Sequence, residues 1–408
     1  MNILFLTLVN IRSFDEKHNI YADLCRALAA EGNLVHIVCP IEKRDDAQTH
    51  FEPYGDGHGI LKVKTGKIQK TNLIRKGIET LLVGRRYKSA IKKHLGDRKY
   101  DLIMYSTPPI TLGNIVKYVK KRDGAASYLL LKDIFPQNAV DLGMMTKSGL
   151  KSVIYKYFRR KEKELYALSD SIGCMSPRNL EYLLENNPEI PREKVHVSPN
   201  SFEPFTEAAS KEKKAEIRKK YDLPENKKIF IYGGNIGKPQ GVPNIVECMR
   251  AVADKEEAHF VICGGGTEYG VLEDYVKASG QKNLTLIPGL PRDEYEEFVA
   301  AGDVGLIFLD YRFTIPNFPS RLLSYMQKSM PIISCTDTST DIGRIAEEGG
   351  FGWNCQSNNV ESFVYAVDSA LSADTDEMGK KAAQYMIDHY SVTKCAKIIL
   401  EENEKAKK

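Results

Sequence analysis

A strand, a glycine-rich loop and a helix, together residues 229–245, constrain the fold of this chain more than any other stretch. The segment reads IFIYGGNIGKPQGVPNI. Ile229–Tyr232 is an unbroken run of apolar β-branched and aromatic side chains, which predicts a buried parallel strand. A helix is expected over Val242–Val252. The glycines between them are Gly233, Gly234, Gly237 and Gly241.

Two interpretations of this loop stay open. Backbone N–H groups in a glycine-rich turn can approach a diphosphate at the start of a helix, and Lys238 would add a cation. An ordinary tight turn also needs glycines, because they tolerate positive φ. A second such loop, Gly264–Thr267, follows the apolar run His259–Cys263 and favours the nucleotide site. The backbone of a third loop, Pro288–Arg292, is placed to contact a base through Leu290.

The same strand–helix alternation begins the chain, where apolar Asn2–Val9 and Leu34–Cys39 flank a helix that ends before Gly32. The chain has 408 residues, enough for roughly two domains of about 200 residues each. We therefore expect an α/β protein with parallel sheets. The predicted divisions are 1–200, 201–385 and a C-terminal helix at 386–408 that packs back toward the first domain.

Charge is distributed unevenly along the chain. Residues 1–200 carry a net charge of +11 and residues 201–408 a net charge of −7. Ten of the residues from Lys70 to Lys99 are basic and two are acidic, with Leu82 and Tyr87 among apolar residues at helical spacing. Such a helix can lie on an anionic membrane or pack its apolar face on the sheet. Nucleic acid is the less favoured partner, since no recognition module accompanies the patch.

A second basic and aromatic helix is predicted at 151–163, whereas the charged helix at 208–221 has no clear core face and is expected on the surface. The eight cysteines are scattered without a CxxC pair, a pattern that fits reduced, buried thiols. No run of 18 apolar residues is present, and the N-terminus lacks the features of a signal peptide. The sequence thus predicts a cytoplasmic protein associated peripherally with the inner face of the membrane.

The order of these motifs resembles glycosyltransferase family 4 of the GT-B fold, two Rossmann-like domains facing across a cleft. The resemblance covers almost the whole chain. Its markers are GGNIGKPQG, ICGGG, LIPGLPRDEYEEFVAAGDVGLIFL and NFPSRLLSYMQKSMPIIS, all in the second half. More narrowly, STPPITLG and LLLKDIFPQNAVDLGMM resemble bacterial enzymes that build surface polysaccharide or O-antigen units on a lipid carrier.

The resemblance implies site residues, with departures. The family's diphosphate-binding Arg and Lys correspond to Asn235 and Gln240, which leaves Lys238 as the loop cation. Its paired glutamates correspond to Pro316 and Ser324. Lys132, beside Asp133, roughly takes the place of the family's histidine, and this pair is the predicted catalytic group. The predicted donor-binding residues are Gly234, Asn235, Gly237, Lys238, Gln240, Gly265, Gly266, Leu290, Asn317, Phe318, Ser320, Arg321 and Ser324.

By this resemblance the expected activity is retaining transfer of a sugar from a nucleotide-sugar, UDP-linked, to a glycan on a polyprenyl diphosphate or similar carrier. No metal is expected, because no paired acidic cluster supplies oxygen ligands. No further cofactor is expected besides the donor. Two alternatives remain: a nucleotide-sugar epimerase, and a non-catalytic subunit that kept the fold without the glutamates.

Overall fold

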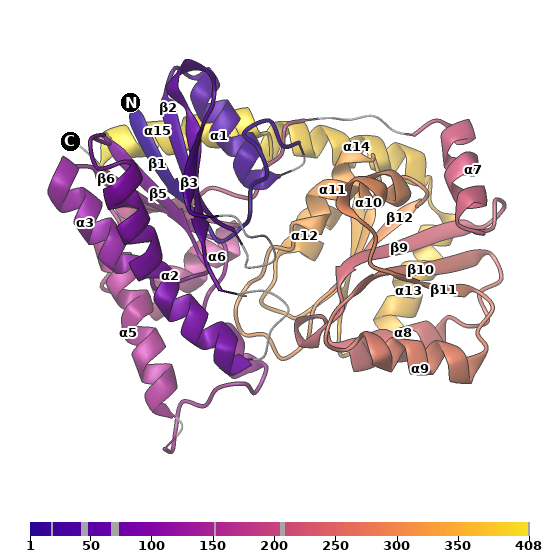
Figure 1. The fold of residues 1–408 in the computed structure, drawn as a ribbon. Helices are drawn as coiled ribbons and strands as arrows, with labels where there is room; N and C mark the ends of the chain where they lie inside the picture. Colours follow the sequence, from indigo (N-terminus) through magenta and orange to yellow (C-terminus); the bar gives the residue numbers. More distant parts are fainter. Residues whose placement is uncertain (18, 42–47, 67–72, 151, 205–208, 407–408) are drawn as a thin grey trace. The chain divides into compact units, whose positions relative to one another are not determined.

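The computed structural model describes the chain except residues 18, 42–47, 67–72, 151, 205–208 and 407–408. The chain divides into two compact units (Figure 1). The N-terminal unit contains Met1–Glu203 together with Ser391–Lys408, and the C-terminal unit contains Pro204–Tyr390. Each unit is built on its own sheet, so the predicted α/β class with two Rossmann-like halves is confirmed.

The N-terminal unit has an eight-stranded sheet in the order β3-β4-β2-β1-β5-β6-β7-β8. Among the described strands of this sheet, only β3 runs antiparallel to its neighbour. The strands are β1 (Asn2–Leu6), β2 (Leu34–Ile41), β3 (His50–Pro53), β4 (Gly59–Lys64), β5 (Leu102–Ser106), β6 (Ala126–Leu131), β7 (Ser171–Cys174) and β8 (Val195–Val197). The helices are α1 (Ile20–Ala30), α2 (Leu73–His94), α3 (Gly113–Asp123), α4 (Gln137–Asp141), α5 (Ser152–Leu168), α6 (Pro177–Asn186) and α15 (Val392–Lys405), with short turns η1 (Gly55–Gly57) and η2 (Arg192–Lys194).

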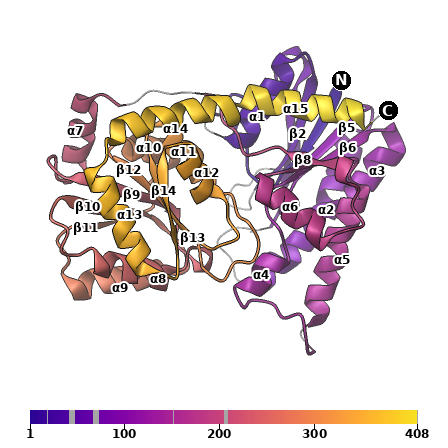
Figure 2. The ribbon, with the colours of Figure 1, turned by 180° about the vertical axis from the view of Figure 1, so that it is seen from behind.

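Both faces of this sheet are covered by helices, which is why its strands are apolar throughout. In β1, Leu4 and Leu6 lie in the core that includes α2, α3, α5 and α6. The alternate residues Ile3 and Phe5 lie in the core that includes α1 and α15. Figure 2 shows α15, in yellow, running beside α1. The last helix of the chain thus completes the first unit.

The predicted basic helix is present as α2. Residues 70–72 of that stretch lie outside the described residues, and so do the side chains of 73–81, including Arg75 and Lys76. All eight cysteines are buried free thiols, which confirms the prediction. Within the described ranges, no helix combines the length and apolarity needed to cross a bilayer.

The C-terminal unit has a six-stranded parallel sheet in the order β11-β10-β9-β12-β13-β14. The strands are β9 (Lys228–Asn235), β10 (Ala258–Gly265), β11 (Leu284–Pro288), β12 (Val304–Phe308), β13 (Ile332–Thr336) and β14 (Gly352–Gln356). The helices are α7 (Lys211–Lys220), α8 (Val242–Ala251), α9 (Tyr269–Ser279), α10 (Arg292–Val299), α11 (Arg321–Gln327), α12 (Ile342–Glu348), α13 (Val360–Ser372) and α14 (Thr375–His389), with the turn η3 (Lys238–Gln240).

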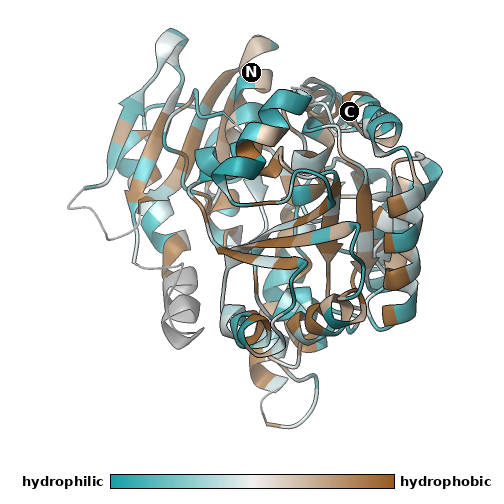
Figure 3. Ribbon diagram, turned by 90° about the vertical axis from the view of Figure 1, so that its right-hand side faces the viewer, coloured by the Kyte–Doolittle hydropathy of each residue, from teal (hydrophilic) through white to brown (hydrophobic). Residues whose placement is uncertain are grey.

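This strand order has a functional consequence. From β9 the chain builds β10 and β11 on one side and then returns to add β12 on the other. In open parallel sheets, ligands bind at the carboxyl ends of the strands where the order reverses. Figure 3 shows the strands mostly in brown, with teal on many helix surfaces, as expected for buried sheets. A ligand site is therefore expected at the carboxyl ends of β9 and β12, where the strand order reverses.

The helix expected without a core face, α7, has one. Ile217 and Arg218 are buried on it. Arg218 Nη2 lies 2.6 Å from Asp303 Oδ2, and its Nε donates to Ala301 O at 3.0 Å. The same Asp303 oxygen accepts from the Ile229 N–H at 2.8 Å. One carboxylate thus connects α7, the start of β9 and the segment that precedes β12.

Replacing Asp303 with alanine should destabilise the C-terminal unit by about 3 kcal/mol, because Arg218 would remain buried without its counter-charge. Urea unfolding followed by the fluorescence of the single tryptophan, Trp353 on β14, measures this. The control is Asp254→Ala, an exposed carboxylate, which should change stability by less than about 0.5 kcal/mol. Equal stability of the two variants would contradict the role given to Asp303.

Candidate functional site

The two glycine-rich loops at the ends of β9 and β10 lie against one another. The register pairs Gly264 with Gly234 and Gly265 with Asn235. A Cβ on Gly264 would overlap Gly234 O, and a Cβ on Gly266 would overlap Ile236 O. The glycines therefore allow close backbone approach between neighbouring loops, as well as any contact with a ligand.

Most of the loop amides have partners inside the protein. The Ile236 N–H donates to Gly265 O at 3.0 Å, and the Gly237 N–H donates to Gln240 Oε1 at 3.2 Å. Gln240 Oε1 also accepts from Asn235 Nδ2 at 2.7 Å. Gln240 is buried and shapes the loop, whereas Lys238 is exposed. Several of the backbone amides predicted to bind a diphosphate thus donate hydrogen bonds within the protein instead. Binding of an anion at this loop therefore requires further donors.

Arg321, at the start of α11, supplies such a donor. Its guanidinium lies over the Tyr232 ring at 4.3 Å from the centroid. Its Nη2 is the atom nearest to where a Cβ on Gly234 would stand, at 3.4 Å. Among the described residues, Nη1 is buried without a hydrogen-bond partner, and the charge is surrounded by tyrosines rather than carboxylates. A half-buried arginine, whose buried Nη1 has no hydrogen-bond partner among the described residues, therefore lies directly beside the exposed Gly234.

Three tyrosines build the wall around this cation. The Tyr232 hydroxyl donates to Asn235 O at 2.6 Å, and the Tyr325 hydroxyl donates to Leu306 O at 3.1 Å. Tyr295 occupies the space that a side chain on Gly233 would need. Burial raises the pKa of Tyr295 and of Tyr325, so both stay neutral at ordinary pH. Sequence analysis named Tyr232 only as part of a strand, and it missed Tyr295 and Tyr325, because only the fold brings those two to the glycines.

The remaining predicted donor-site residues differ in exposure. Phe318 and Ser324 are buried, with Phe318 packed on Tyr390 at 5.5 Å between ring centroids. Ser320 is exposed, just before Arg321. Gly265 and Gly266 are exposed at the end of β10, and Leu290 is half-buried beyond β11.

Asn317 is held by a network that sequence analysis did not anticipate. Its N–H donates to Thr340 Oγ1 at 3.1 Å, and Thr340 Oγ1 donates to Asp337 Oδ2 at 3.0 Å. Burial raises the pKa of Asp337 to about 6, while hydrogen bonds from Thr340 and Ser339 act in the opposite direction. The network fixes the backbone just before α11, and so it helps to position Arg321.

Lys132 and Asp133, the predicted catalytic residues, have different partners in the structure. Lys132 Nζ donates to Ser198 O at 3.3 Å and lies near Cys395 of α15. Burial lowers the pKa of Lys132 to about 8. Asp133 instead accepts from Asn138 Nδ2, at 2.9 and 3.0 Å to its two oxygens. Adjacent residues leaving a strand point to opposite sides, which separates the two charges.

No group of three or more potential metal ligands of the types His, Cys, Asp and Glu is found in the part of the chain that the structure describes.

Comparisons with known proteins relate the chain to glycosyltransferases. Residues 213–388 match the family described as Glycosyl transferases group 1. WbjE of Pseudomonas aeruginosa, named as a glycosyltransferase, is 25% identical over 330 residues, which cover 80% of each chain. WcaI of Escherichia coli K12, named for glycosyl transfer in colanic acid biosynthesis, is 25% identical over 276 residues, 67% of each chain.

Solved structures show the same fold. HepE of Anabaena, in a complex with UDP-glucose, superposes with a TM-score of 0.66 at 13% identity, covering 99% of this chain and 100% of that one. The two Rossmann-like units thus form the GT-B fold. Residues 213–388 are a group 1 glycosyl transferase domain, and the chain is a glycosyltransferase.

Replacing Lys132 with methionine should raise stability by about 1–3 kcal/mol at pH 7, because a buried charge without a carboxylate is removed. In the native protein, Lys132 loses its proton above about pH 8, whereas the unfolded chain keeps it to about pH 10.4. Wild-type stability therefore rises between these values, and the advantage of the variant should shrink. Urea unfolding at pH 7 and near pH 10 measures this.

Lys121→Met, at an exposed lysine, is the matched control and should show no such dependence. If Lys132→Met abolished sugar transfer at unchanged stability, Lys132 would have the predicted catalytic role instead of a structural one.

Proposed function

We propose that this glycosyltransferase moves a sugar from a UDP-sugar, with retention of anomeric configuration, to a lipid-carried glycan during polysaccharide biosynthesis. The observation that carries the proposal is the half-buried Arg321, whose buried Nη1 has no partner and which has no described carboxylate, beside exposed Gly234. It lies where the strand order reverses, the usual ligand position in such sheets. HepE, with the same fold, was solved with UDP-glucose, and WcaI is named for colanic acid biosynthesis.

Arg321 suits the diphosphate for electrostatic reasons. A guanidinium offers a planar fork of donors that matches phosphate oxygens. The tyrosine wall excludes competing carboxylates, so the charge is free for a ligand that approaches over Gly234. As the bond from sugar to diphosphate breaks, negative charge grows on the leaving UDP. A fixed cation in a poorly hydrated position stabilises that charge more than it stabilises the intact donor.

Arg321 supplies a cation beside the loop, where this chain lacks the cations of the family pattern. There, Asn235 and Gln240 stand in place of the family's cations, and Lys238 is exposed. Arg321 enters the same position from α11 instead. Lys238 remains a candidate for a second, mobile contact with the diphosphate. The sugar hydroxyls would then be bound by neutral groups such as Asn317 and Ser320, because no glutamate occupies the positions of Pro316 and Ser324.

The acceptor side of the proposal rests on the N-terminal unit. Its net positive charge suits an anionic membrane surface and a lipid-diphosphate carrier. Asp133, held by Asn138 at the end of β6, is the polar residue proposed to contact the acceptor. The enzyme would then work as a peripheral protein at the inner face of the cell membrane.

Incubation of the purified chain with a panel of UDP-sugars and a polyprenyl-diphosphate-linked acceptor tests the proposal. Release of UDP should depend on the acceptor, and NMR of the product should show the same anomeric configuration as the donor. Turnover only with a donor carrying another nucleotide would refute the UDP assignment. An inverted product would refute retention, and transfer only to free sugars would refute the lipid-linked acceptor.

Replacing Arg321 with methionine should weaken UDP binding about 10- to 100-fold, the loss expected for a charge-assisted hydrogen bond of about 1.5–3 kcal/mol. The same variant should be as stable as the wild type or more stable, because an uncompensated buried charge disappears. Calorimetric titration with UDP and thermal unfolding measure the two effects. Lower affinity combined with undiminished stability separates a binding role from a structural one.

Two matched variants sharpen this test. Arg321→Lys keeps the charge but loses the fork, and should fall between wild type and methionine. Arg250→Met, on the exposed surface of α8, should bind UDP like the wild type. If Arg321→Met bound UDP normally, the diphosphate would have to lie elsewhere.

A further inference from the structure

The described part of α2 does not provide an apolar surface for a membrane. Val83, Tyr87 and Ile91 are buried in the core beside the N-terminal sheet. The Tyr87 hydroxyl donates to Thr7 O at 2.8 Å, inside that core. The proposed membrane association therefore needs apolar side chains from another element.

Such side chains gather at the start of α5. Of the ten exposed large apolar residues among those described, five lie between Met144 and Tyr157. Leu150 is 97% exposed, Val153 68%, Ile154 55% and Tyr157 44%. We call these four residues the apolar tip. Val153, Ile154 and Tyr157 fall at helical spacings that place them on neighbouring parts of one helix face. Scattered exposed apolar residues are normal, but a cluster of this kind marks an interaction surface.

The charges around the apolar tip have one sign. The twenty residues from Leu142 to Lys161 include six lysines and arginines and no aspartate or glutamate. The acidic residues of α5 come later, and Glu164 is already paired with Lys117 and Lys161, at 2.5 and 2.9 Å. A segment that combines exposed apolar side chains with an excess of cations suits the boundary of an anionic bilayer.

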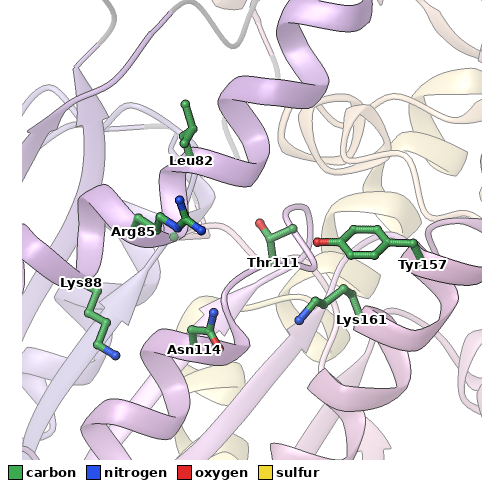
Figure 4. A pocket seen from close by; sticks show the side chains of 8 residues that line it. Leu82, Arg85, Lys88, Thr111, Asn114, Tyr157 and Lys161 are labelled. Carbon is green, nitrogen blue, oxygen red and sulfur yellow. The ribbon is translucent and has the colours of Figure 1, made fainter. Parts of the chain in front are cut away.

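A cavity of about 700 Å3 opens beside the tip, between α2, the start of α3 and α5. Figure 4 shows Arg85 on α2 facing Tyr157 and Lys161 on α5, with Thr111 between them. The remaining lining residues are Leu82, Gly84, Lys88 and Asn114.

Two of the three cations that line this cavity, Arg85 and Lys88, are available for an anion. Neither Arg85 nor Lys88 has an ion pair among the described residues, and Lys88 lies over the Tyr118 ring at 5.1 Å from its centroid. Lys161 shares Glu164 with Lys117. Tyr157 belongs both to the apolar tip and to the cavity wall, so the two features are continuous.

We propose that the apolar tip inserts into an anionic bilayer and that the adjoining cavity binds the phosphate of a lipid headgroup through Arg85 and Lys88. This inference rests on the membrane association in the proposed function and gives it a place and a ligand class. A protein partner would not require a cation-lined cavity with an apolar rim, whereas a phospholipid offers a phosphate and an acyl chain at the matching positions. Each cation near an anionic surface contributes about 1 kcal/mol.

Sedimentation of the full chain with vesicles tests the proposal. Wild type should bind vesicles of phosphatidylcholine mixed with phosphatidylglycerol, and should bind pure phosphatidylcholine far less. The double variant Val153→Ser/Ile154→Ser should lose about tenfold or more in partitioning, because apolar burial is removed. These side chains are exposed, so the fold should survive. Tyr365→Ser, at a side chain 75% exposed in the other unit, is the matched control and should bind like wild type.

The cavity has its own pair of variants. Arg85→Ala/Lys88→Ala should reduce binding to the mixed vesicles about 30-fold, corresponding to about 1 kcal/mol for each of the two cations. Lys99→Ala/Lys121→Ala removes the same charge from exposed positions elsewhere on the unit and should have a smaller effect. Glycerol 3-phosphate, followed by NMR chemical shifts, distinguishes the ligand sources. Weak binding that is lost in the cavity variant supports a phosphate site, and tight binding without vesicles would overturn the lipid assignment.

Three results would overturn the inference. The first is equal binding of wild type to neutral and anionic vesicles. The second is an equal loss of vesicle binding in the cavity variant and in its surface control. The third is conversion of a dimer to a monomer by the tip variant while vesicle binding stays unchanged. Transfer of sugar to a water-soluble acceptor should be unaffected by the tip variant. Loss of vesicle binding with transfer intact separates this inference from the proposed function, which fails only if transfer is absent in wild type.

Discussion

The site depends on one unusual interaction, a partly buried guanidinium that lies on an aromatic ring and has no carboxylate partner among the described residues. Arg321 lies on Tyr232, and its Nη1 has no acceptor among the described residues. A cation–π contact is worth up to about 2 kcal/mol when desolvated, which offsets only part of the cost of burying the charge. Proteins keep such a cost where function uses it. In the proposed function, the diphosphate of the donor supplies the missing acceptors.

The glycines make this arrangement sterically possible. Gly233 leaves room for Tyr295, Gly234 leaves Arg321 accessible, and Gly264 lets the loop of β10 touch the loop of β9. Each position lies at the carboxyl end of a strand next to the reversal of strand order. The parallel sheet thus brings together groups that are distant in sequence. In the N-terminal unit, helices also cover both faces of the sheet. Most of the large apolar side chains that stay exposed in this unit lie at or just before the start of α5.

Several features were predictable because they are local. The run Ile229–Tyr232 and the glycines after it are recognisable as strand and turn by composition alone, and the structure has β9 ending in that loop. Pairing between side chains was less predictable. Lys132 and Asp133 are neighbours in sequence, yet they point to different surroundings. In α7, a mostly charged sequence concealed a core face, because burial of Arg218 depends on a distant partner, Asp303.

The sequence by itself determined the α/β architecture, the two-unit organisation, the glycine loops and the excess of positive charge in the first half. These follow from periodicity and composition, which act over a few residues at a time. Only the tertiary structure decided which loop amides remain available, that Arg321 lies beside Gly234, and that Tyr157 joins an apolar tip to a basic cavity. The physical reason is that hydrogen-bond satisfaction and charge compensation depend on which distant segments the fold brings into contact, and a linear pattern does not contain that information.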